Sequence, residues 1–180
     1  MSGIRTKPCD IVRACSFTGH RPAGFTFGHD ESHPQFLKIK ALLEERVALL
    51  AGNGVATFYS GMASGVDQWC AEIVLELKKT NPDIRLIAVR PCETQADRWN
   101  EEQRERHYNT LALCDDVITL YKKYTKSCMY ERNRFLVDNA QYVLAVYDGG
   151  SKGGTAYTIG YAKKLRRWVT VIDSNNLSVT

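Results

Sequence analysis

The chain has 180 residues, of which 44% are hydrophobic and 24% are charged, and its formal net charge is +4. This length favours a single domain, and the composition is typical of a globular protein. The net charge is too small, without a long basic run, to indicate nucleic acid as the main partner. We find no signal peptide and no apolar run long enough to span a bilayer, and therefore expect a cytoplasmic protein without a membrane partner.

Six cysteines are scattered singly along the chain, and none forms a C-x-x-C pair. Several lie in apolar runs, where cysteine packs as a small hydrophobic residue, so we expect reduced thiols. His20, His29 and His33 have no second cluster of ligands to accompany them. We therefore expect no metal site.

Short apolar runs rich in β-branched residues predict six strands, at residues 11–17, 55–59, 84–89, 116–120, 142–146 and 168–172. Apolar residues at helical spacing predict amphipathic helices, at residues 35–51, 69–81, 131–139 and 156–165. Residues 1–10 are polar and predict a loose N-terminus. Residues 23–34 lack any period and predict a loop suited to act as a flap over a site.

The alternation of strands and helices predicts an α/β, Rossmann-like three-layer fold, with a mostly parallel sheet of about six strands and helices on both faces. No linker or internal repeat divides the chain, so we expect residues 1–180 to form one domain. Right-handed crossovers place every strand-to-helix loop at one edge of the sheet. In open parallel sheets, ligands bind at that edge.

Four of these loops carry polar residues and glycines, and we expect them to converge on one cleft. Asp67 falls in the first turn of a predicted helix, where a carboxylate suits the helix dipole and can also accept ribose hydroxyls. A purely capping role for Asp67 is the alternative. The first three loops contribute the candidates Thr18, Gly19, His20, Arg21, Ser60, Gly61, Met62, Gly65, Asp67, Arg90 and Glu93.

The fourth loop is the richest in glycine and follows the apolar run at residues 142–146. Glycine lets a ligand approach the main chain, and the helix that follows directs its partially positive end at the same place. We interpret this loop as a cradle for a phosphate or ribose phosphate, and the alternative is an ordinary strand-to-helix turn. Its members are Asp148, Gly149, Gly150, Ser151, Lys152, Gly153, Gly154 and Thr155.

Two nucleotide-binding fingerprints are missing from the sequence. The first turn lacks G-x-G-x-x-G, which disfavours an NAD dehydrogenase, and the absence of a Walker A motif disfavours a P-loop NTPase. The remaining hydroxyls, glycine N–H groups and cations suit a phosphorylated, sugar-bearing ligand, because arginine binds oxygen atoms bidentately. We expect this nucleotide-type ligand and no cofactor, with cations supplied by His20, Arg21, Arg90, Lys152 and Arg132.

Two segments resemble the YpsA-like family of the SLOG superfamily: Ser-Phe-Thr-Gly-His-Arg-Pro at residues 16–22 and Ser-Gly-Met-Ala-Ser-Gly-Val-Asp at residues 60–67. The second segment is also similar to one in DprA, the DNA-processing protein. The resemblance extends from Cys15 to Val171. It implies a Rossmann-like fold, a nucleotide-type ligand at the glycine loops, and self-association, with a homodimer as the expected form.

A further resemblance is to the LOG proteins, phosphoribohydrolases that cleave the base from a nucleoside monophosphate. Met-Tyr-Glu-Arg-Asn at residues 129–133 is similar to their Met-His-Glu-Arg-Lys, which carries the arginine over to Arg132. Their glycine motif continues to a glutamate, whereas Tyr157 and Thr158 occupy the equivalent stretch here. Glycosidic cleavage generally needs a carboxylate near the anomeric carbon, so this departure favours binding over cleavage.

We therefore expect a protein that binds a nucleotide or nucleotide-sugar and acts as a sensor or regulatory module. The alternative is a nucleotide N-glycosidase of LOG type, for which the candidate catalytic residues are Arg132, Asp67 and Glu93. A lesser alternative is DprA-like binding of single-stranded DNA, for which the clustered cations are Lys122, Lys123 and Lys126.

Overall fold

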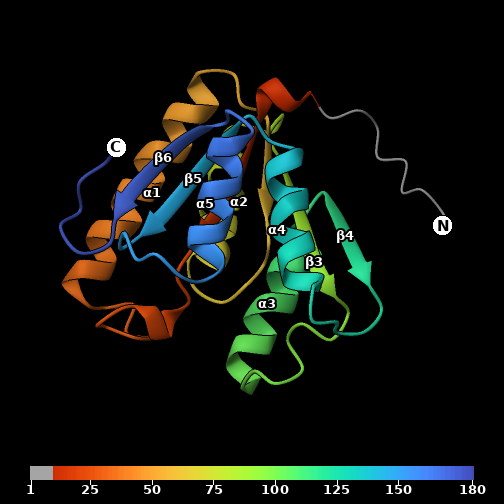
Figure 1. Cartoon of the computed structure of the whole chain (residues 1–180). Helices are drawn as coiled ribbons and strands as arrows, with labels where there is room; N and C mark the ends of the chain where they lie inside the picture. The colour runs from red at the N-terminus through yellow and green to blue at the C-terminus, as the bar shows by residue number, and fades with distance from the viewer. Residues whose placement is uncertain (1–9) are drawn as a thin grey trace.

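The computed structural model describes residues 10–180 and shows three layers, with a sheet between two layers of helices (Figure 1). All strand pairs of the sheet are parallel, and the strand order is β4-β3-β2-β1-β5-β6. The predicted Rossmann-like α/β fold with six strands is confirmed. The strands are β1 (Ala14–Gly19), β2 (Thr57–Ser60), β3 (Arg85–Cys92), β4 (Asp116–Tyr121), β5 (Tyr142–Tyr147) and β6 (Trp168–Asp173).

The helices divide between the two faces of the sheet because the chain changes direction once. From β1 to β4 each strand is added on the same side, and right-handed crossovers keep the intervening helices on one face. The chain then returns to place β5 beside β1, and the next two helices cover the other face. The first group is α1 (Pro34–Gly52), α2 (Val66–Lys78) and α3 (Glu101–Leu113), and the second is α4 (Cys128–Asp138) and α5 (Gly154–Lys164).

The core follows the alternation of side chains along the strands. Cys15 and Phe17 of β1 point to the α1–α2 side and join a large cluster that includes Ile39 and Trp69. Ala14 points the other way and joins a smaller cluster under α4. The strands are buried on both faces because each face is covered by helices, which explains their nearly continuous apolar sequences.

The largest differences from the predicted strand boundaries are at the start of β1 and the end of β3. Residues 11–13 form a short 3-10 helix capped by the Asp10 carboxylate, so β1 begins only at Ala14 and continues to Gly19. Strand β3 continues through Pro91, although proline was expected to end it. Beyond Ala88, β3 has no paired residue in β2 and continues beside β4 alone. Pro91 has no backbone N–H, and this is tolerated because the side of β3 that faces away from β4 is unpaired there. The predicted loose terminus lies outside the described residues, apart from Asp10.

The segment between β1 and α1 is packed against the core, which corrects the expectation of a flap. The Phe25 and Phe27 rings stack with their centroids 4.8 Å apart, and both contact Trp69. The side chain of His33 then caps α1 by accepting a hydrogen bond from the Gln35 N–H. These contacts fix the segment as a wall of the molecule.

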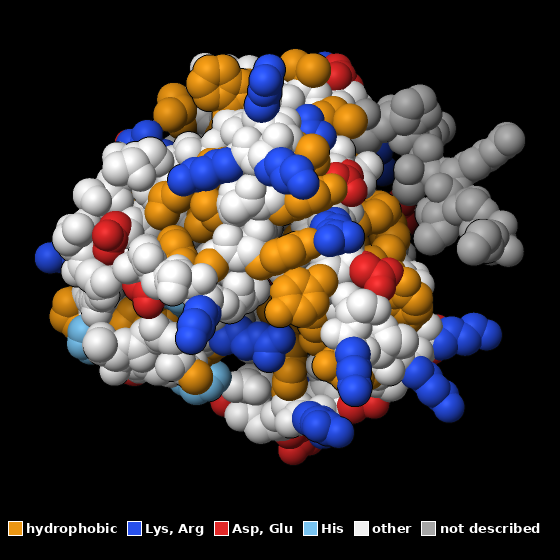
Figure 2. All heavy atoms as spheres, viewed as in Figure 1, with side chains coloured by type: hydrophobic (Ala, Val, Ile, Leu, Met, Phe, Trp, Pro, Cys, Tyr) orange, Lys and Arg blue, Asp and Glu red, His pale blue; other side chains and the backbone are white. Residues whose placement is uncertain are grey.

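The exposed face over α4 and α5 carries many Lys and Arg side chains among hydrophobic ones (Figure 2). Acidic side chains are sparser on this face. Among the helices of residues 10–180, none has both the length and the apolar character needed to cross a membrane.

Candidate functional site

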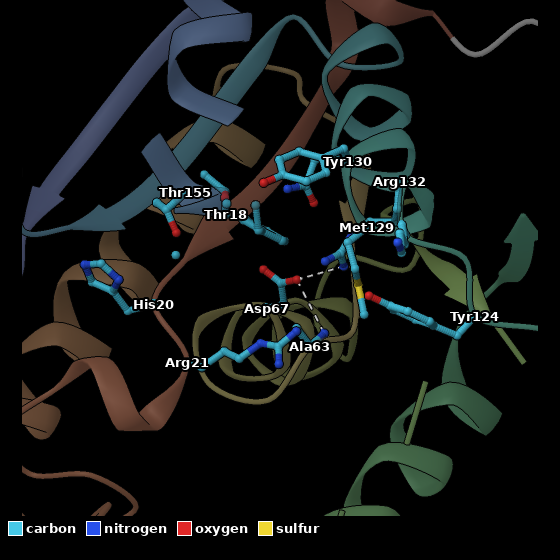
Figure 3. A pocket seen from close by; sticks show the side chains of 15 residues that line it. Thr18, His20, Arg21, Ala63, Asp67, Tyr124, Met129, Tyr130, Arg132 and Thr155 are labelled. Atoms are coloured by element: carbon cyan, nitrogen blue, oxygen red, sulfur yellow. Dashed lines mark hydrogen bonds and ion pairs between the residues drawn. The ribbon is translucent and has the colours of Figure 1, made fainter. Parts of the chain in front are cut away.

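A cavity of about 440 Å³ opens at the carboxyl edge of the sheet. It lies where the strand order reverses, because β1 connects to β2 on one side and β5 connects to β6 on the other. Such a crevice is the usual ligand site of open α/β sheets. Figure 3 shows residues from β1, α2, α4 and α5 facing this space. The sequence-predicted residues that line it are Thr18, Gly19, His20, Arg21, Asp67, Arg132, Gly154 and Thr155.

A buried ion pair forms one wall of the cavity. Arg132 of α4 donates from Nη1 to the Asp67 Oδ2 atom at 3.2 Å and to the Gly61 carbonyl oxygen. The same Asp67 oxygen accepts a hydrogen bond from the Ala63 N–H, at 3.4 Å. Both side chains are less than a tenth exposed. In Figure 3 the second carboxylate oxygen of Asp67 is turned toward the open space between Thr18 and Thr155.

Burial is the main cause of the shifted pKa values of Asp67 and Arg132. Burial raises the pKa of Asp67 above its ordinary value, and the charge of Arg132 opposes that rise. Burial likewise lowers the pKa of Arg132, and Asp67 opposes that change. Arg132 Nε is buried and has no hydrogen-bond partner among the described residues. The pair therefore keeps one unsatisfied polar atom beside the cavity, a feature that functional sites often show.

Glycine is required at two positions of the loop between β2 and α2. A Cβ at Gly61 would lie 1.6 Å from Arg132 Nη1, so only glycine lets the guanidinium reach the loop. Gly65 has a φ of 90°, and a Cβ there would lie 2.6 Å from the His20 carbonyl oxygen. Ser60 Oγ donates to the Asp67 carbonyl oxygen and accepts from the Met62 N–H. None of Ser60, Gly61, Met62 and Gly65 lines the cavity, and their contacts shape the loop that carries Asp67.

The loop after β3 does not reach the cavity. Arg90 donates to Thr119 Oγ1 of the neighbouring strand, and Glu93 is exposed. Instead, the nearby Gln95 donates from Nε2 to the carbonyl oxygens of Gly61 and Met62, at 3.0 Å each. Sequence reasoning missed Gln95, because only the folded chain brings it against the β2–α2 loop. Three of the four loops that were expected to converge therefore reach the cavity. The loop after β3 lies outside the cavity and contacts the β2–α2 loop through Gln95.

Most of the glycine-rich loop also lies outside the cavity. Residues 148–153 are exposed, and only Gly154 and Thr155, at the start of α5, line the cavity. Gly149 and Gly153 have φ values of 83° and 102°, which explains the need for glycine in this turn. The loop is anchored at Asp148, whose Oδ1 lies 3.1 Å from His20 Nε2 and accepts from the Gly150 N–H. These contacts hold the pKa of Asp148 below its ordinary value.

The mouth of the cavity is formed by residues that the sequence did not identify as nucleotide contacts, although Lys126 was named as a cation for DNA binding. Tyr124 and Lys126 come from the loop before α4, and Met129 and Tyr130 from its first turn. Tyr124 and Tyr130 are 61% and 49% exposed, which leaves them accessible to a ligand. The similarity of residues 129–133 to the LOG motif was the available signal, but it directed attention to Arg132 alone.

The start of α5 brings no carboxylate to the cavity. Thr158 is buried and donates back to the Gly154 carbonyl oxygen at 2.8 Å. Tyr157 points to the helix surface, where it packs edge-on against Tyr130 and accepts from Arg134. Among the residues that line the cavity, Asp67 is the one carboxylate. This position of α5 therefore offers no acid for glycosidic cleavage.

Solved structures with a similar fold include the DNA processing protein A (DprA) of Streptococcus pneumoniae, with a TM-score of 0.61 at 17% identity. That likeness covers 93% of this chain and 52% of DprA, so the chain spans about half of that protein's length. The structure of TM1055 matches with a TM-score of 0.54 at 16% identity, over 87% of this chain and 71% of that one. At these identities the likenesses show the fold alone.

Relatives found by sequence have higher identity to this chain than these structures do. The chain is 30% identical to the UPF0398 protein of Lysinibacillus sphaericus, over 82% of this chain and 83% of the relative. It is 31% identical to a UPF0398 protein of Halalkalibacterium halodurans, over 85% and 82% of the two chains. The family model described as the YspA SLOG family matches residues 15–174. These matches confirm the predicted resemblance: the chain belongs to the YpsA-like family of SLOG proteins.

Proposed function

We propose that this protein binds a nucleotide or nucleotide-sugar in the cavity and acts as a ligand sensor or regulatory module. The observation that carries the proposal is the pairing of an anion-suited end of the cavity with an aromatic mouth. A volume of about 440 Å³ falls in the range of small-molecule sites. Membership of the SLOG family agrees with a nucleotide-type ligand.

The anion-suited end is the start of α5, and two cations on the cavity wall add to its positive charge. The first backbone N–H groups of α5, at Gly154 and Thr155, have no partner within the helix and carry its positive dipole. Arg21 and Lys126 line the same cavity, and neither forms an ion pair with any residue from 10 to 180. Because Asp67 and Arg132 neutralise each other, the net charge of the cavity is positive. A phosphate is the group that this end would hold.

The remaining walls suit a sugar and a base. The second carboxylate oxygen of Asp67, which faces the cavity, can accept hydrogen bonds from the hydroxyl groups of a ribose. Tyr124 and Tyr130 offer exposed rings at the mouth, where a base can stack. The ligand would therefore extend from the α5 terminus, past Asp67, to the tyrosines.

Calorimetric titration and thermal-shift measurements with AMP, ADP-ribose, NAD and cyclic AMP test this proposal. We expect at least one of these ligands to bind, and Arg21→Ala or Lys126→Ala to weaken that binding by roughly tenfold or more, since each removes a charged contact. Lys123→Ala is the matched control, because Lys123 is exposed close to Lys126 but does not line the cavity. No stabilisation by any of the four ligands at millimolar concentration would refute the proposal.

A second candidate function is hydrolysis of the N-glycosidic bond of a nucleotide. The observation that favours it is Asp67, a buried carboxylate with a raised pKa and one oxygen facing the cavity. A carboxylate in that place can stabilise the oxocarbenium-like state or accept a proton from the attacking water. Chromatography of a nucleoside monophosphate incubated with the protein tests this. Base release that Asp67→Asn abolishes would support it, and unchanged substrate would exclude it.

A further inference from the structure

The C-terminal end of α5 and the start of β6 form an exposed knob that is both apolar and basic. Trp168 is 69% exposed and Leu165 is 37% exposed, although both are large hydrophobic residues. Lys163, Lys164 and Arg166 are exposed around them. Figure 2 shows Lys and Arg side chains gathered with hydrophobic ones over this end of α5. We call this surface, defined by these five residues, the basic knob.

The cations of the basic knob are free to pair with a partner. Lys163, Lys164 and Arg166 form no ion pair with any residue from 10 to 180. The adjacent Arg167 behaves differently, because it donates to the Asp138 carbonyl oxygen and to the Gln141 side chain. An exposed tryptophan surrounded by unpaired cations is typical of a protein contact, where tryptophan contributes strongly to binding energy.

A groove of about 500 Å³ with the opposite charge runs between α2 and α3. Its apolar lining includes Leu75 and Leu113, and Leu113 is 64% exposed. We call it the acidic groove, and the acidic residues that line it are Glu72, Glu76, Glu102 and Glu105.

Internal ion pairs neutralise only part of that negative charge. Arg106 lies between Glu72 and Glu31 and pairs with both, and Lys79 pairs with Glu76. Glu102 and Glu105 form no ion pair within the described part of the chain. The groove is therefore acidic on a chain whose net charge is +4.

We propose that the basic knob of one copy of this chain docks in the acidic groove of a second copy. Trp168 would cover the apolar lining, and Lys163, Lys164 and Arg166 would face Glu102 and Glu105. The two surfaces lie on opposite faces of the sheet, since α5 covers one face and α2 and α3 cover the other. The contact is therefore heterologous, head to tail, and produces a ring or an open chain of subunits. It does not depend on the cavity or on its ligand.

Two variants that each disable one surface test this contact. The knob variant carries Lys163→Glu and Lys164→Glu, and the groove variant carries Glu102→Lys and Glu105→Lys. By analytical ultracentrifugation we expect the wild type to self-associate, with an affinity that falls as salt is raised because the contact is charged. Each variant alone is expected to sediment as a monomer.

Mixing the two variants gives the decisive result. The intact groove of the knob variant can accept the intact knob of the groove variant, and the reversed charges of the two altered surfaces also attract each other, so the mixture should associate although neither variant does so alone. Trp168→Ala should weaken association of the wild type by roughly tenfold or more, as expected for a central aromatic residue. Circular dichroism of each variant confirms that it is folded before its sedimentation is interpreted.

Matched controls reverse charges elsewhere on the surface. Lys122→Glu with Lys123→Glu alters the loop that follows β4, and Glu44→Lys with Glu45→Lys alters α1. Both double variants should associate like the wild type. A wild type that remains monomeric at high protein concentration would overturn the proposal. So would variants that still associate alone, or a mixture of the two variants that stays monomeric.

Discussion

At the scale of single residues, Gly61 shows how one missing side chain permits the site. Its Cβ position is occupied by the Arg132 guanidinium, so Gly61→Ala should displace that group and leave Asp67 buried without its partner. We expect a loss of roughly 3 kcal/mol or more in the free energy of unfolding, measured by urea denaturation. Gly160→Ala is the control, because Gly160 is exposed within α5 with open space around it. That change should stabilise the protein by about 0.5–1 kcal/mol. If Gly61→Ala and Gly160→Ala changed the free energy of unfolding equally, the contact with Arg132 would not be the reason for glycine at position 61.

His107 predicts a pH dependence of stability. It is 1% exposed, and burial together with the nearby Arg90 lowers its pKa from 6.5 to about 4. Between these values the unfolded chain binds a proton that the folded chain does not, so stability is complete above pH 6.5 and falls as the pH drops toward 4. The contribution is roughly 3 kcal/mol.

Urea denaturation of the wild type and of His107→Gln across this pH range measures that contribution. The variant has no ionisable ring, so its stability should vary less with pH. Parallel curves for the two proteins would show that another group is responsible. The His107 ring packs against Trp99 and forms a hydrogen bond with the Met62 backbone, so protonation of His107 would also affect the β2–α2 loop.

At the scale of elements, the Asp67–Arg132 pair joins α2 to α4 across the carboxyl edge of the sheet. Arg132→Met should cost roughly 3–5 kcal/mol, because it leaves a buried carboxylate unpaired. Adding Asp67→Asn should recover part of that loss, since an amide needs no counter-charge. A double-mutant cycle by urea denaturation measures the coupling. Simple additivity of the two changes would show that the pair does not act as a unit.

The sequence predicted the existence of the elements better than it predicted their ends. Six strands and four of the five helices follow from the spacing of apolar residues, because that spacing reflects burial against a covered sheet, whereas α3 was not predicted. The end of β3 was misplaced, because Pro91 is acceptable only where the neighbouring strand β2 has already stopped. Whether Pro91 is tolerated depends on the relative lengths of β2 and β3, and the local sequence around Pro91 does not indicate those lengths.

At the scale of the whole molecule, the sheet predicts a gradient of local stability. Strands β1 and β5 lie in the interior of the sheet and are almost wholly buried, whereas β4 is an edge strand with exposed residues such as Val117. Hydrogen exchange followed by mass spectrometry should therefore show the strongest protection in β1 and β5 and the weakest in β4. Ligand binding should raise protection at the start of α5. Uniform protection across the sheet would contradict this order.

The sequence alone determined the fold class and named most of the groups near the cavity. Local patterns of burial and turn formation produced both results, and the short segments at residues 16–22 and 60–67 indicated the family. Only the tertiary structure separated the residues that face the ligand space from those that support it. Arg90 forms a hydrogen bond with the neighbouring strand β4, and most of the glycine-rich loop lies at the surface. Gln95 stabilises the loop before Asp67 by hydrogen bonding to its carbonyl oxygens from outside the cavity. Strand order and helix packing bring together side chains from β1, α2, α4 and α5, and those contacts are set by three-dimensional geometry, which no single segment of sequence contains.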